Sequence, residues 1–258
     1  MSVFVDKLKS LSEGEHQPIG FGARQTASSG LKILLVAQLS QEAAEGTSDN
    51  LVGADAVLLG VSRAGTVAES LKKVSGSLSD IPCGMWLQGG GKTRIKQIAK
   101  TESDFIVFPV ADTPISMIED TKAGKIIEVE ASVDGGLLRT VNTLPVDAVL
   151  VAGEEKKEDV LTWQQLMVFQ RFADILTKPL LVPVPAKVTG KELLSLWEAG
   201  VSGVVVEADG QDRITKLRQE IDKLDFPSQR RRDKSEAVLP RTGRETSRAA
   251  IEEEDEDY

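Results

Sequence analysis

The chain repeats a pair of short apolar segments four times, always in the same order. The first member of each pair begins with Lys or Pro and covers 32–38, 82–87, 125–130 and 179–184. The second member begins with a small polar residue and covers 55–60, 104–109, 147–152 and 202–207. The leading residues of these second members, Asp55, Asp104, Asp147 and Ser202, recur at intervals of roughly 50 residues. Short, nearly continuous apolar runs of this kind are typical of parallel strands covered by helices.

The segments between these runs have the length of helices. Apolar residues at helical spacing predict helices over 161–176, 189–199 and 213–224, and shorter ones over 41–50, 66–74 and 92–100. Pro114 suits the first turn of one further helix. Eight strands that alternate with helices over about 180 residues predict a compact (β/α)8 barrel of the TIM type. The chain length of 258 residues fits one such domain with short loops.

Three regions follow from this pattern. Residues 1–30 combine a short amphipathic helix over 2–11 with an irregular, Gly- and Ser-rich lead-in. We expect that helix either to close the bottom of the barrel or to dock a protein partner. Residues 31–226 form the barrel. Residues 227–258 carry scattered Arg and Ser and end in an acidic run, so we expect a disordered, charged C-terminal tail, which is a second possible partner-binding segment.

Composition narrows the functional classes. The net charge of −9 and the pI near 4.9 argue against a nucleic-acid binder, whose surface is basic. No apolar run is long enough to span a membrane, and no leader is evident, so we expect a cytoplasmic protein without membrane contact. The single cysteine, Cys83, lies in an apolar run and fits a reducing compartment. His16 is the only histidine, so the usual nitrogen and sulfur ligands of a zinc site and a His-based nucleophile relay are missing. No metal site is predicted, and no cofactor is identified.

The segment 179–209 carries a resemblance to a known group of barrels. It contains Pro-Leu-Leu-Val-Pro-Val-Pro, then a helix, then Glu-Ala-Gly-Val-Ser-Gly-Val-Val-Val-Glu over 198–207. This resembles the last two units of phosphate-binding (β/α)8 barrels such as indole-glycerol-phosphate synthase and thiamine-phosphate synthase. The resemblance implies a phosphate site in the loops after strands seven and eight, where Lys187, Gly190 and Gly210 are the residues that could serve.

The same segment also departs from those families. Pro183 and Pro185 offer no N–H group to a phosphate, and Glu207 and Asp209 would repel an anion. The resemblance therefore supports the barrel more than it supports a phosphate site.

The fifth strand supplies candidate catalytic residues. Glu128 and Glu130 lie two positions apart and so share one face of the strand, while Ile127 and Val129 share the other. Because the helix-facing side must be apolar, we expect both glutamates to point into the barrel, with Glu130 nearer the C-terminal end and the better placed general acid or base. The alternative is that both are structural and are paired with Arg or Lys inside the barrel.

Other strand ends supply candidate ligand-binding residues. Trp86 and Gln88 share a face at the end of the third strand, and Lys92 follows the glycine run 89–91 at the expected start of a helix. Arg63 comes from the loop after the second strand, so that it and Lys92 could flank one anionic group. Gln38 at the end of the first strand and Lys187 after the seventh complete the set of candidate ligand-binding residues.

The sequence leaves two functions open. The first is a degenerate barrel without evident catalytic machinery, which serves as a scaffold or binds a protein partner or a small ligand. The alternative is a small-molecule enzyme of the lyase or isomerase type, which acts on an anionic substrate at the C-terminal face with Glu130 as acid or base. The sequence identifies neither the substrate nor the oligomeric state.

Overall fold

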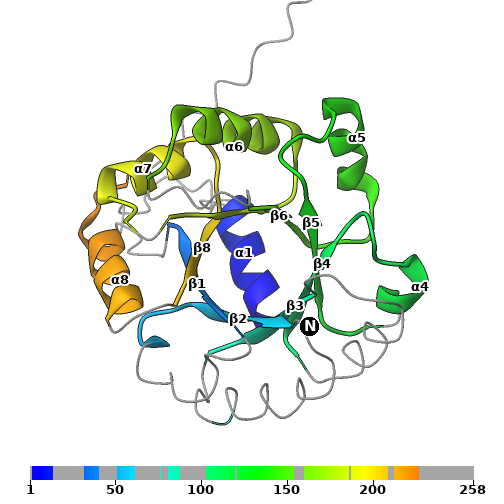
Figure 1. Cartoon of the computed structure of the whole chain (residues 1–258), viewed down its shortest axis with the longest axis horizontal. Coiled ribbons are helices and arrows are strands. Elements are labelled where there is room, and N and C mark those ends of the chain that lie inside the picture. The colour runs from blue at the N-terminus through cyan, green and yellow to red at the C-terminus, as the bar shows by residue number, and fades with distance from the viewer. Residues whose placement is uncertain are drawn as a thin grey trace, which may run out of the picture.

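The computed structural model describes residues 2–13, 32–40, 51–61, 76, 81–87, 103–119, 121–153, 160–185, 187–208 and 212–226. Eight parallel strands pair in sequence order and close into a barrel, which confirms the predicted fold (Figure 1). The strands are β1 Leu34–Leu39, β2 Ala56–Val61, β3 Cys83–Leu87, β4 Phe105–Pro109, β5 Gly124–Val129, β6 Ala148–Val151, β7 Leu180–Pro183 and β8 Gly203–Glu207. Every one of them falls within a residue or two of a run expected from the hydrophobic pattern.

The described helices flank the barrel along β4 to β8, and one helix closes one of its ends. They are α1 Val3–Glu13, α4 Ile115–Ile118, α5 Gly135–Thr140 with the 3-10 turn η2 Val141–Thr143, α6 Trp163–Ile175, α7 Gly190–Glu198 and α8 Arg213–Lys223. Pro114 stands at the N-cap of α4. The three long helices expected over 161–176, 189–199 and 213–224 are confirmed as α6, α7 and α8. The helices expected over 41–50, 66–74 and 92–100, most of the lead-in and the tail 227–258 lie outside the described residues.

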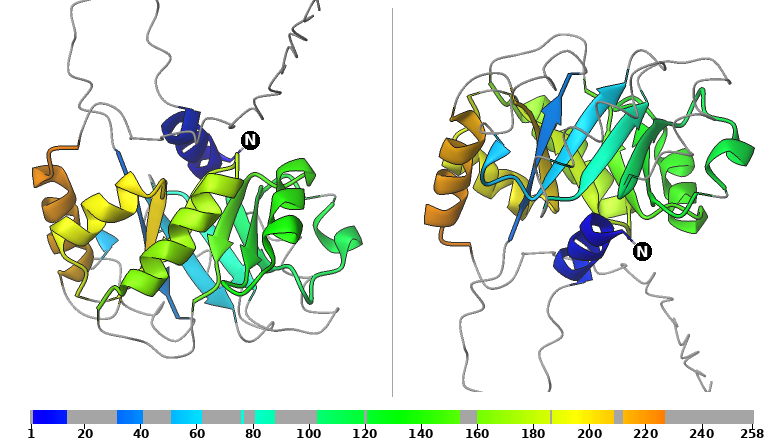
Figure 2. Two further views of the ribbon diagram at one scale, coloured as in Figure 1. Left: turned by 90° about the horizontal axis from the view of Figure 1, so that it is seen from above. Right: turned by 90° about the horizontal axis from the view of Figure 1, so that it is seen from below.

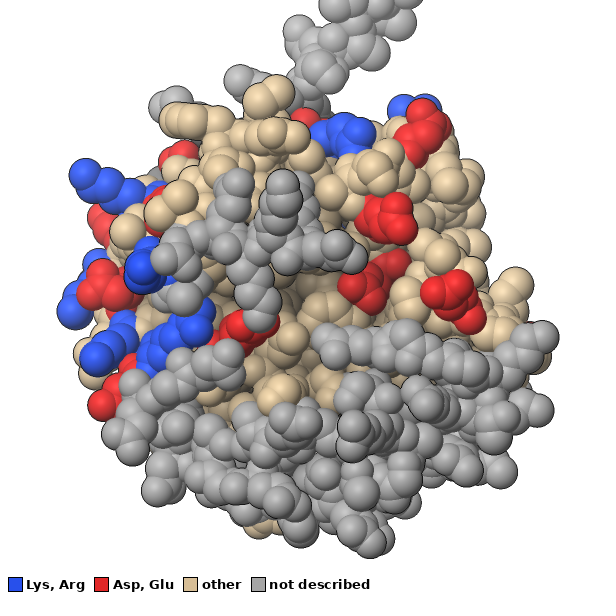
Figure 3. All heavy atoms as spheres, viewed as in Figure 1, with Lys and Arg blue, Asp and Glu red and all other residues tan. Residues whose placement is uncertain are grey.

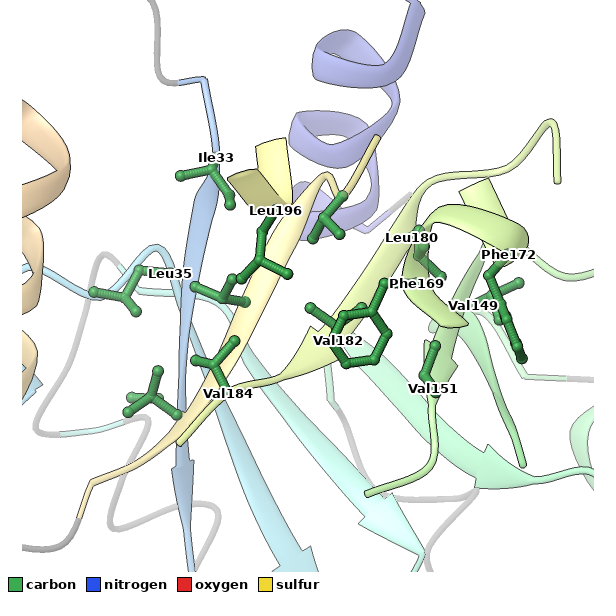
Figure 4. Packing of buried hydrophobic residues seen from close by; sticks show 14 of the residues in the cluster. Ile33, Leu35, Val149, Val151, Phe169, Phe172, Leu180, Val182, Val184 and Leu196 are labelled. Carbon is green, nitrogen blue, oxygen red and sulfur yellow. The ribbon is translucent and has the colours of Figure 1, made fainter. Parts of the chain in front are cut away.

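Side chains alternate between two cores along each strand. The outer core lies between strands and helices, where Phe169 and Phe172 of α6 pack over Val149, Val151 and Val182 (Figure 4). The inner core fills the barrel and takes the alternate positions of the same strands. Cys83 and Met85 belong to the outer core and Trp86 to the inner one, as the strand alternation predicts.

The strand pairings set the height of each inward side chain. Followed once around the barrel, the pairings return to β1 displaced by about eight residues, which is the shear of this fold. With this shear, the inward side chains form layers of four, and each layer comes from either the odd-numbered or the even-numbered strands. One layer is filled by branched aliphatic residues of the even-numbered strands, Leu58, Val107, Leu150 and Val205. Below it the ring of Phe105 occupies the place where a side chain at Gly84 would stand, since a Cβ there would lie 2.3 Å from the ring.

Helix α1 closes the N-terminal end of the barrel, as Figure 2 shows from two sides. Phe4 and Leu8 are fully buried in the inner core, and the rings of Phe4 and Phe105 lie 4.6 Å apart. Gly124, at the start of β5, lets α1 lie close against the barrel, because a Cβ there would come within 2.4 Å of Val5. The N-terminal helix is therefore part of the barrel core.

Two aspartates at the starts of strands, Asp104 and Asp147, bind α1 to this end of the barrel. Asp104 accepts hydrogen bonds from the N–H groups of Val3 and Phe4, at 2.7 and 2.9 Å, and from the Ser2 hydroxyl at 2.8 Å. The two N–H groups are the first backbone donors of α1, which have no partner within the helix. Asp147 accepts from Lys9 of α1 at 2.6 Å and from the backbone N–H of Lys125 at 2.9 Å.

Asp55, just before β2, also connects separate elements at the N-terminal end of the barrel. It accepts from the N–H of Leu35 at 2.8 Å and forms an ion pair with Arg218 of α8, which also donates to the carbonyl of Gly53. The three aspartates that mark the sequence repeat therefore hold the N-terminal end together.

Candidate functional site

The C-terminal end of the barrel is built differently from the closed end. Above the aliphatic layer, the next layer comes from the odd-numbered strands and consists of Gln38, Trp86, Glu128 and Pro183. We call these four residues the floor. Three of them carry polar groups, and they replace the hydrocarbon that fills the barrel below.

Glu128 and Trp86 are joined across the floor. The indole Nε1–H of Trp86 donates to Oε2 of Glu128 at 2.8 Å, although the two residues are 42 positions apart in the chain. This bond fixes the carboxyl group against an aromatic ring that is 8 % exposed. Burial raises the pKa of Glu128 above its ordinary value of 4.5, and the hydrogen bond from Trp86 offsets part of that increase.

Glu130 occupies a different environment from the one we expected. Strand β5 ends at Val129, so Glu130 already belongs to the following turn, where it is exposed and accepts from the hydroxyl of Ser132 at 3.2 Å. Glu128 takes the half-buried, inward position instead. The structure thus favours Glu128 over Glu130 as the carboxyl group with an unusual environment, because only Glu128 is still within the strand that aims it inward.

The layer of inward residues above the floor consists mostly of small residues. It comes from the even-numbered strands and consists of Gly60, Pro109, Ala152 and Glu207, which we call the wall. Glu207 is paired in register with Gln38, which places it one layer above the floor and beside β1. Three of the four wall residues are too small to fill a barrel interior. Figure 3, which looks onto this end, shows a hollow at its centre.

Two further predicted residues can be placed. Gln38 lies on the floor and is half-buried, on the strand opposite Glu128. Lys187 lies on the loop after β7 and is exposed. Arg63, Gln88 and Lys92 lie outside the described residues, so their roles remain predictions.

The loop after β7 offers little to a phosphate in its described part. The prolines at 183 and 185 have no N–H group. The N-terminus of α7 is already occupied by a capping box, in which Thr189 accepts from the N–H of Glu192, and Glu192 accepts from the N–H of Thr189 at 2.7 Å. The carboxylate of Glu192 thus stands where an anion would bind a free helix end.

Neither a metal centre nor a membrane span is found in the part of the chain that the structure describes. No group of three or more His, Cys, Asp or Glu side chains among those residues could hold a metal ion. Within the same ranges, no helix has both the length and the apolar character needed to cross a membrane.

Reasoning from the sequence alone treats Glu207 as a group that would repel an anion, does not place it among the site residues, and favours Glu130 over Glu128. Strand alternation indicates which way a side chain points, but not how deep it lies. Depth depends on the shear, which shifts each strand relative to its neighbours. A layer assignment that assumed a shear of 8 would have placed Gln38, Trp86 and Glu128 at one level.

No family model matches this chain, and no curated protein matches it. Among solved structures, a mutant tryptophan synthase alpha-subunit from the hyperthermophile Pyrococcus furiosus is similar at 13% sequence identity and a TM-score of 0.53. That similarity covers 74% of this chain and 97% of the other. A protein from Aquifex aeolicus VF5 is similar at 13% identity and a TM-score of 0.58, over 86% of this chain and 97% of that one. At such low identity the likeness extends to the fold: this chain is a (β/α)8 barrel of the kind found in the tryptophan synthase alpha-subunit.

Proposed function

We propose that the protein is a small-molecule enzyme of the lyase or isomerase type, with its site at the C-terminal end of the barrel. Glu128 is the general acid or base in this proposal. The observation that carries it is the half-buried, inward carboxyl group of Glu128, held by the Trp86 indole on a polar floor beneath a hollow.

The chemistry follows from the position of this group. A carboxyl group transfers protons best near neutral pH when burial raises its pKa, and burial acts on Glu128 in that direction. The Trp86 bond engages only Oε2, so Oε1 retains its capacity to reach a substrate. The C-terminal ends of the strands are also where barrels of this type carry their active sites.

The scaffold alternative has less support. It relied in part on α1 as a partner-binding helix, and α1 is committed to the barrel core through Phe4, Leu8 and the bonds to Asp104. The tail, its other basis, lies outside the described residues. A pure scaffold would have no need of a general acid or base on the floor, which is the role proposed for Glu128.

The proposal is tested by a substrate screen followed by matched variants. Small metabolites are screened for a change in the NMR signal of the Trp86 indole, assigned with Trp86→Phe, and each compound that binds is followed for conversion. We expect Glu128→Gln to lower kcat on a converted compound by about 10²–10⁴-fold, since that is the usual contribution of a general acid or base. Glu130→Gln, with an exposed carboxylate two positions away, should leave kcat within about threefold of the parent. Equal activity of Glu128→Gln and the parent would contradict the proposal.

A further inference from the structure

Helix α6 has an outer face that no described residue covers. The helix lies on the outside of the barrel, between α5 and α7 (Figure 1). On that face Trp163 is 82 % exposed and Met167 is 70 % exposed, and Val160, three positions before the helix, is 57 % exposed. Together with Val160, the exposed residues of the helix form what we call the α6 face: Trp163, Gln164, Met167, Gln170, Arg171 and Asp174.

The composition of the α6 face differs from that of the exposed side of α8. The exposed residues of α8 are charged apart from one glutamine: Lys216, Gln219, Glu220, Asp222 and Lys223. The α6 face carries only Arg171 and Asp174, one charge of each sign, although 28% of the chain is charged. The buried parts of protein interfaces are enriched in aromatic residues, Met and Arg, and depleted of Lys, Glu and Asp. The α6 face thus has the composition of an interface, whereas α8 has that of a surface in water.

We infer that the α6 face binds a second copy of this chain, with the two α6 helices antiparallel and a twofold axis at Met167. Trp163 and Arg171 lie four residues before and after Met167, and Gln164 and Gln170 lie three residues before and after it. Because an α-helix turns by about 100° per residue, the members of each pair lie on opposite flanks of Met167. In the antiparallel dimer Trp163 therefore meets Arg171 of the second copy, and the reverse contact forms on the other side of the axis. Gln164 meets Gln170 in the same way, and Met167 meets Met167 on the axis.

Each of these contacts is chemically matched. A guanidinium stacks on the face of an indole by cation–π attraction and keeps its N–H groups for hydrogen bonds. Nη2 of Arg171 already donates to the carbonyl of Ala131 at 2.6 Å, which restricts the side chain before the contact forms and lowers the entropy lost on binding. Side-chain amides both donate and accept, so Gln164 and Gln170 are complementary. A second copy of α6 therefore offers this face a matching group at each position.

The size and the charge of the face favour a weak dimer. Its seven side chains expose on the order of 700 Å² per copy, close to the 800 Å² or so that each partner buries in a specific interface. The chain has a net charge of −9, so two copies repel each other overall, whereas the α6 face has no net charge. We expect a dissociation constant on the order of 10 µM. None of these residues belongs to the floor or the wall, so the inference is independent of the proposed function.

The first test follows the intact protein by sedimentation velocity from about 1 to about 300 µM. We expect a reversible monomer–dimer equilibrium. Trp163→Ala should raise the dissociation constant at least about tenfold, because a central aromatic residue dominates the energy of such an interface. Ile115→Ala is the matched control: Ile115 is 83 % exposed on α4, outside the α6 face, and its loss should change the constant less than about twofold. All four exposed side chains tested here and below leave the core intact, which circular dichroism verifies.

The second test locates the twofold axis. Met167→Lys and Met167→Glu each bring two like charges together on the axis, so neither variant alone should dimerise up to about 300 µM. An equimolar mixture of the two should form a heterodimer at least about tenfold more stable than either homodimer. The same pair of changes at Gln219, on the exposed side of α8, should leave the dimerisation of each variant as in the parent.

Three results would overturn the inference. One is a protein that stays monomeric over the whole concentration range, and another is a dimer that Trp163→Ala does not weaken. The third is a mixture of Met167→Lys and Met167→Glu that does not dimerise. In a monomer, protection of Trp163 from acrylamide quenching, measured against Trp163→Phe, would mean that another segment of the same chain covers the α6 face.

Discussion

The two ends of this barrel use the same residue types for opposite purposes. At the N-terminal end, Asp55, Asp104 and Asp147 each receive hydrogen bonds from backbone N–H groups, and each also receives a bond from a charged or hydroxyl side chain. At the C-terminal end, Glu128 accepts one hydrogen bond from a neutral indole and is partly desolvated by burial. Asp147 at the closed end is thus stabilised in its charged form, whereas Glu128 at the open end is not.

This difference shows in the direction of the pKa shifts. Burial alone would raise the pKa of Asp147, but the bonds from Lys125 and Lys9 and the charges of Lys9 and Lys178 hold it below its usual value. Burial raises the pKa of Glu128, and the single bond from Trp86 does not compensate. The closed end therefore contributes stability, while the open end retains a group suited to proton transfer at some cost in stability.

The largest expected effect is at the closed end. Phe4→Ala removes a fully buried ring that packs on Phe105, and it should lower the free energy of unfolding by about 3–5 kcal/mol. Urea unfolding followed by far-UV circular dichroism measures this. Val3→Ala, next to it on α1 but 55 % exposed, is the control and should change stability by less than about 0.5 kcal/mol. Similar losses in the two variants would mean that α1 does not pack into the barrel as described.

Loss of the cap on α1 should have the next largest effect. Asp104→Ala removes three hydrogen bonds to the first turn of the helix and should cost about 1–3 kcal/mol of unfolding free energy. Hydrogen exchange should report faster exchange of the α1 amides. Asp112→Ala, an exposed aspartate at the other end, should have no measurable effect on either quantity. Unchanged exchange in α1 after loss of Asp104 would contradict the capping role.

Asp147→Asn should weaken the closed end in a pH-dependent way. The folded-state pKa of Asp147 lies below that of the unfolded chain, so its contribution is present above the unfolded value and is lost as the pH falls through the folded value. Because Lys9 and Asp147 are both partly exposed, we expect a loss of at most about 1 kcal/mol at neutral pH, and a smaller one in acid. Urea unfolding at several pH values tests this. A loss that grows as the pH falls would have the wrong sign.

Glu128→Gln should have the smallest effect on stability, and of the opposite sign. The folded-state pKa of Glu128 lies above that of the unfolded chain, so its contribution is fully present below the unfolded pKa and is lost as the pH rises through the folded pKa. The amide keeps an acceptor for Trp86 and removes the charge. We expect the variant to equal or exceed the parent by a few tenths of a kcal/mol at neutral pH, after allowance for screening, and to lose this advantage in acid. A clear destabilisation at neutral pH would make Glu128 a structural residue like the aspartates.

The barrel is predictable from the sequence because its strands are local patterns. All eight strands and the inward direction of Trp86 and Glu128 follow from runs of apolar residues and their alternation. The repeat of Asp55, Asp104 and Asp147 is visible in the sequence, yet its purpose is not, because the N–H groups that these aspartates bind lie about 20 to 100 residues earlier in the chain.

The site is harder to predict for the same reason. The sequence favours Glu130 over Glu128 because Glu130 is nearer the end of the apolar run, but the position of the strand's last residue decides between exposure and burial. The bond between Trp86 and Glu128 joins strands that are not neighbours in the sheet. Such contacts across the barrel depend on its shear, which no single segment encodes.

The central claim, that Glu128 is an ionisable group poised on a polar floor, is tested most directly by a pH titration of the three indole Nε1–H signals. Trp163 and Trp197 serve as internal controls in the same spectrum. We expect the Trp86 signal to titrate with an apparent pKa above the ordinary value of 4.5, and this transition to vanish in Glu128→Gln. A transition at or below 4.5, or one that persists in Glu128→Gln, would contradict the account.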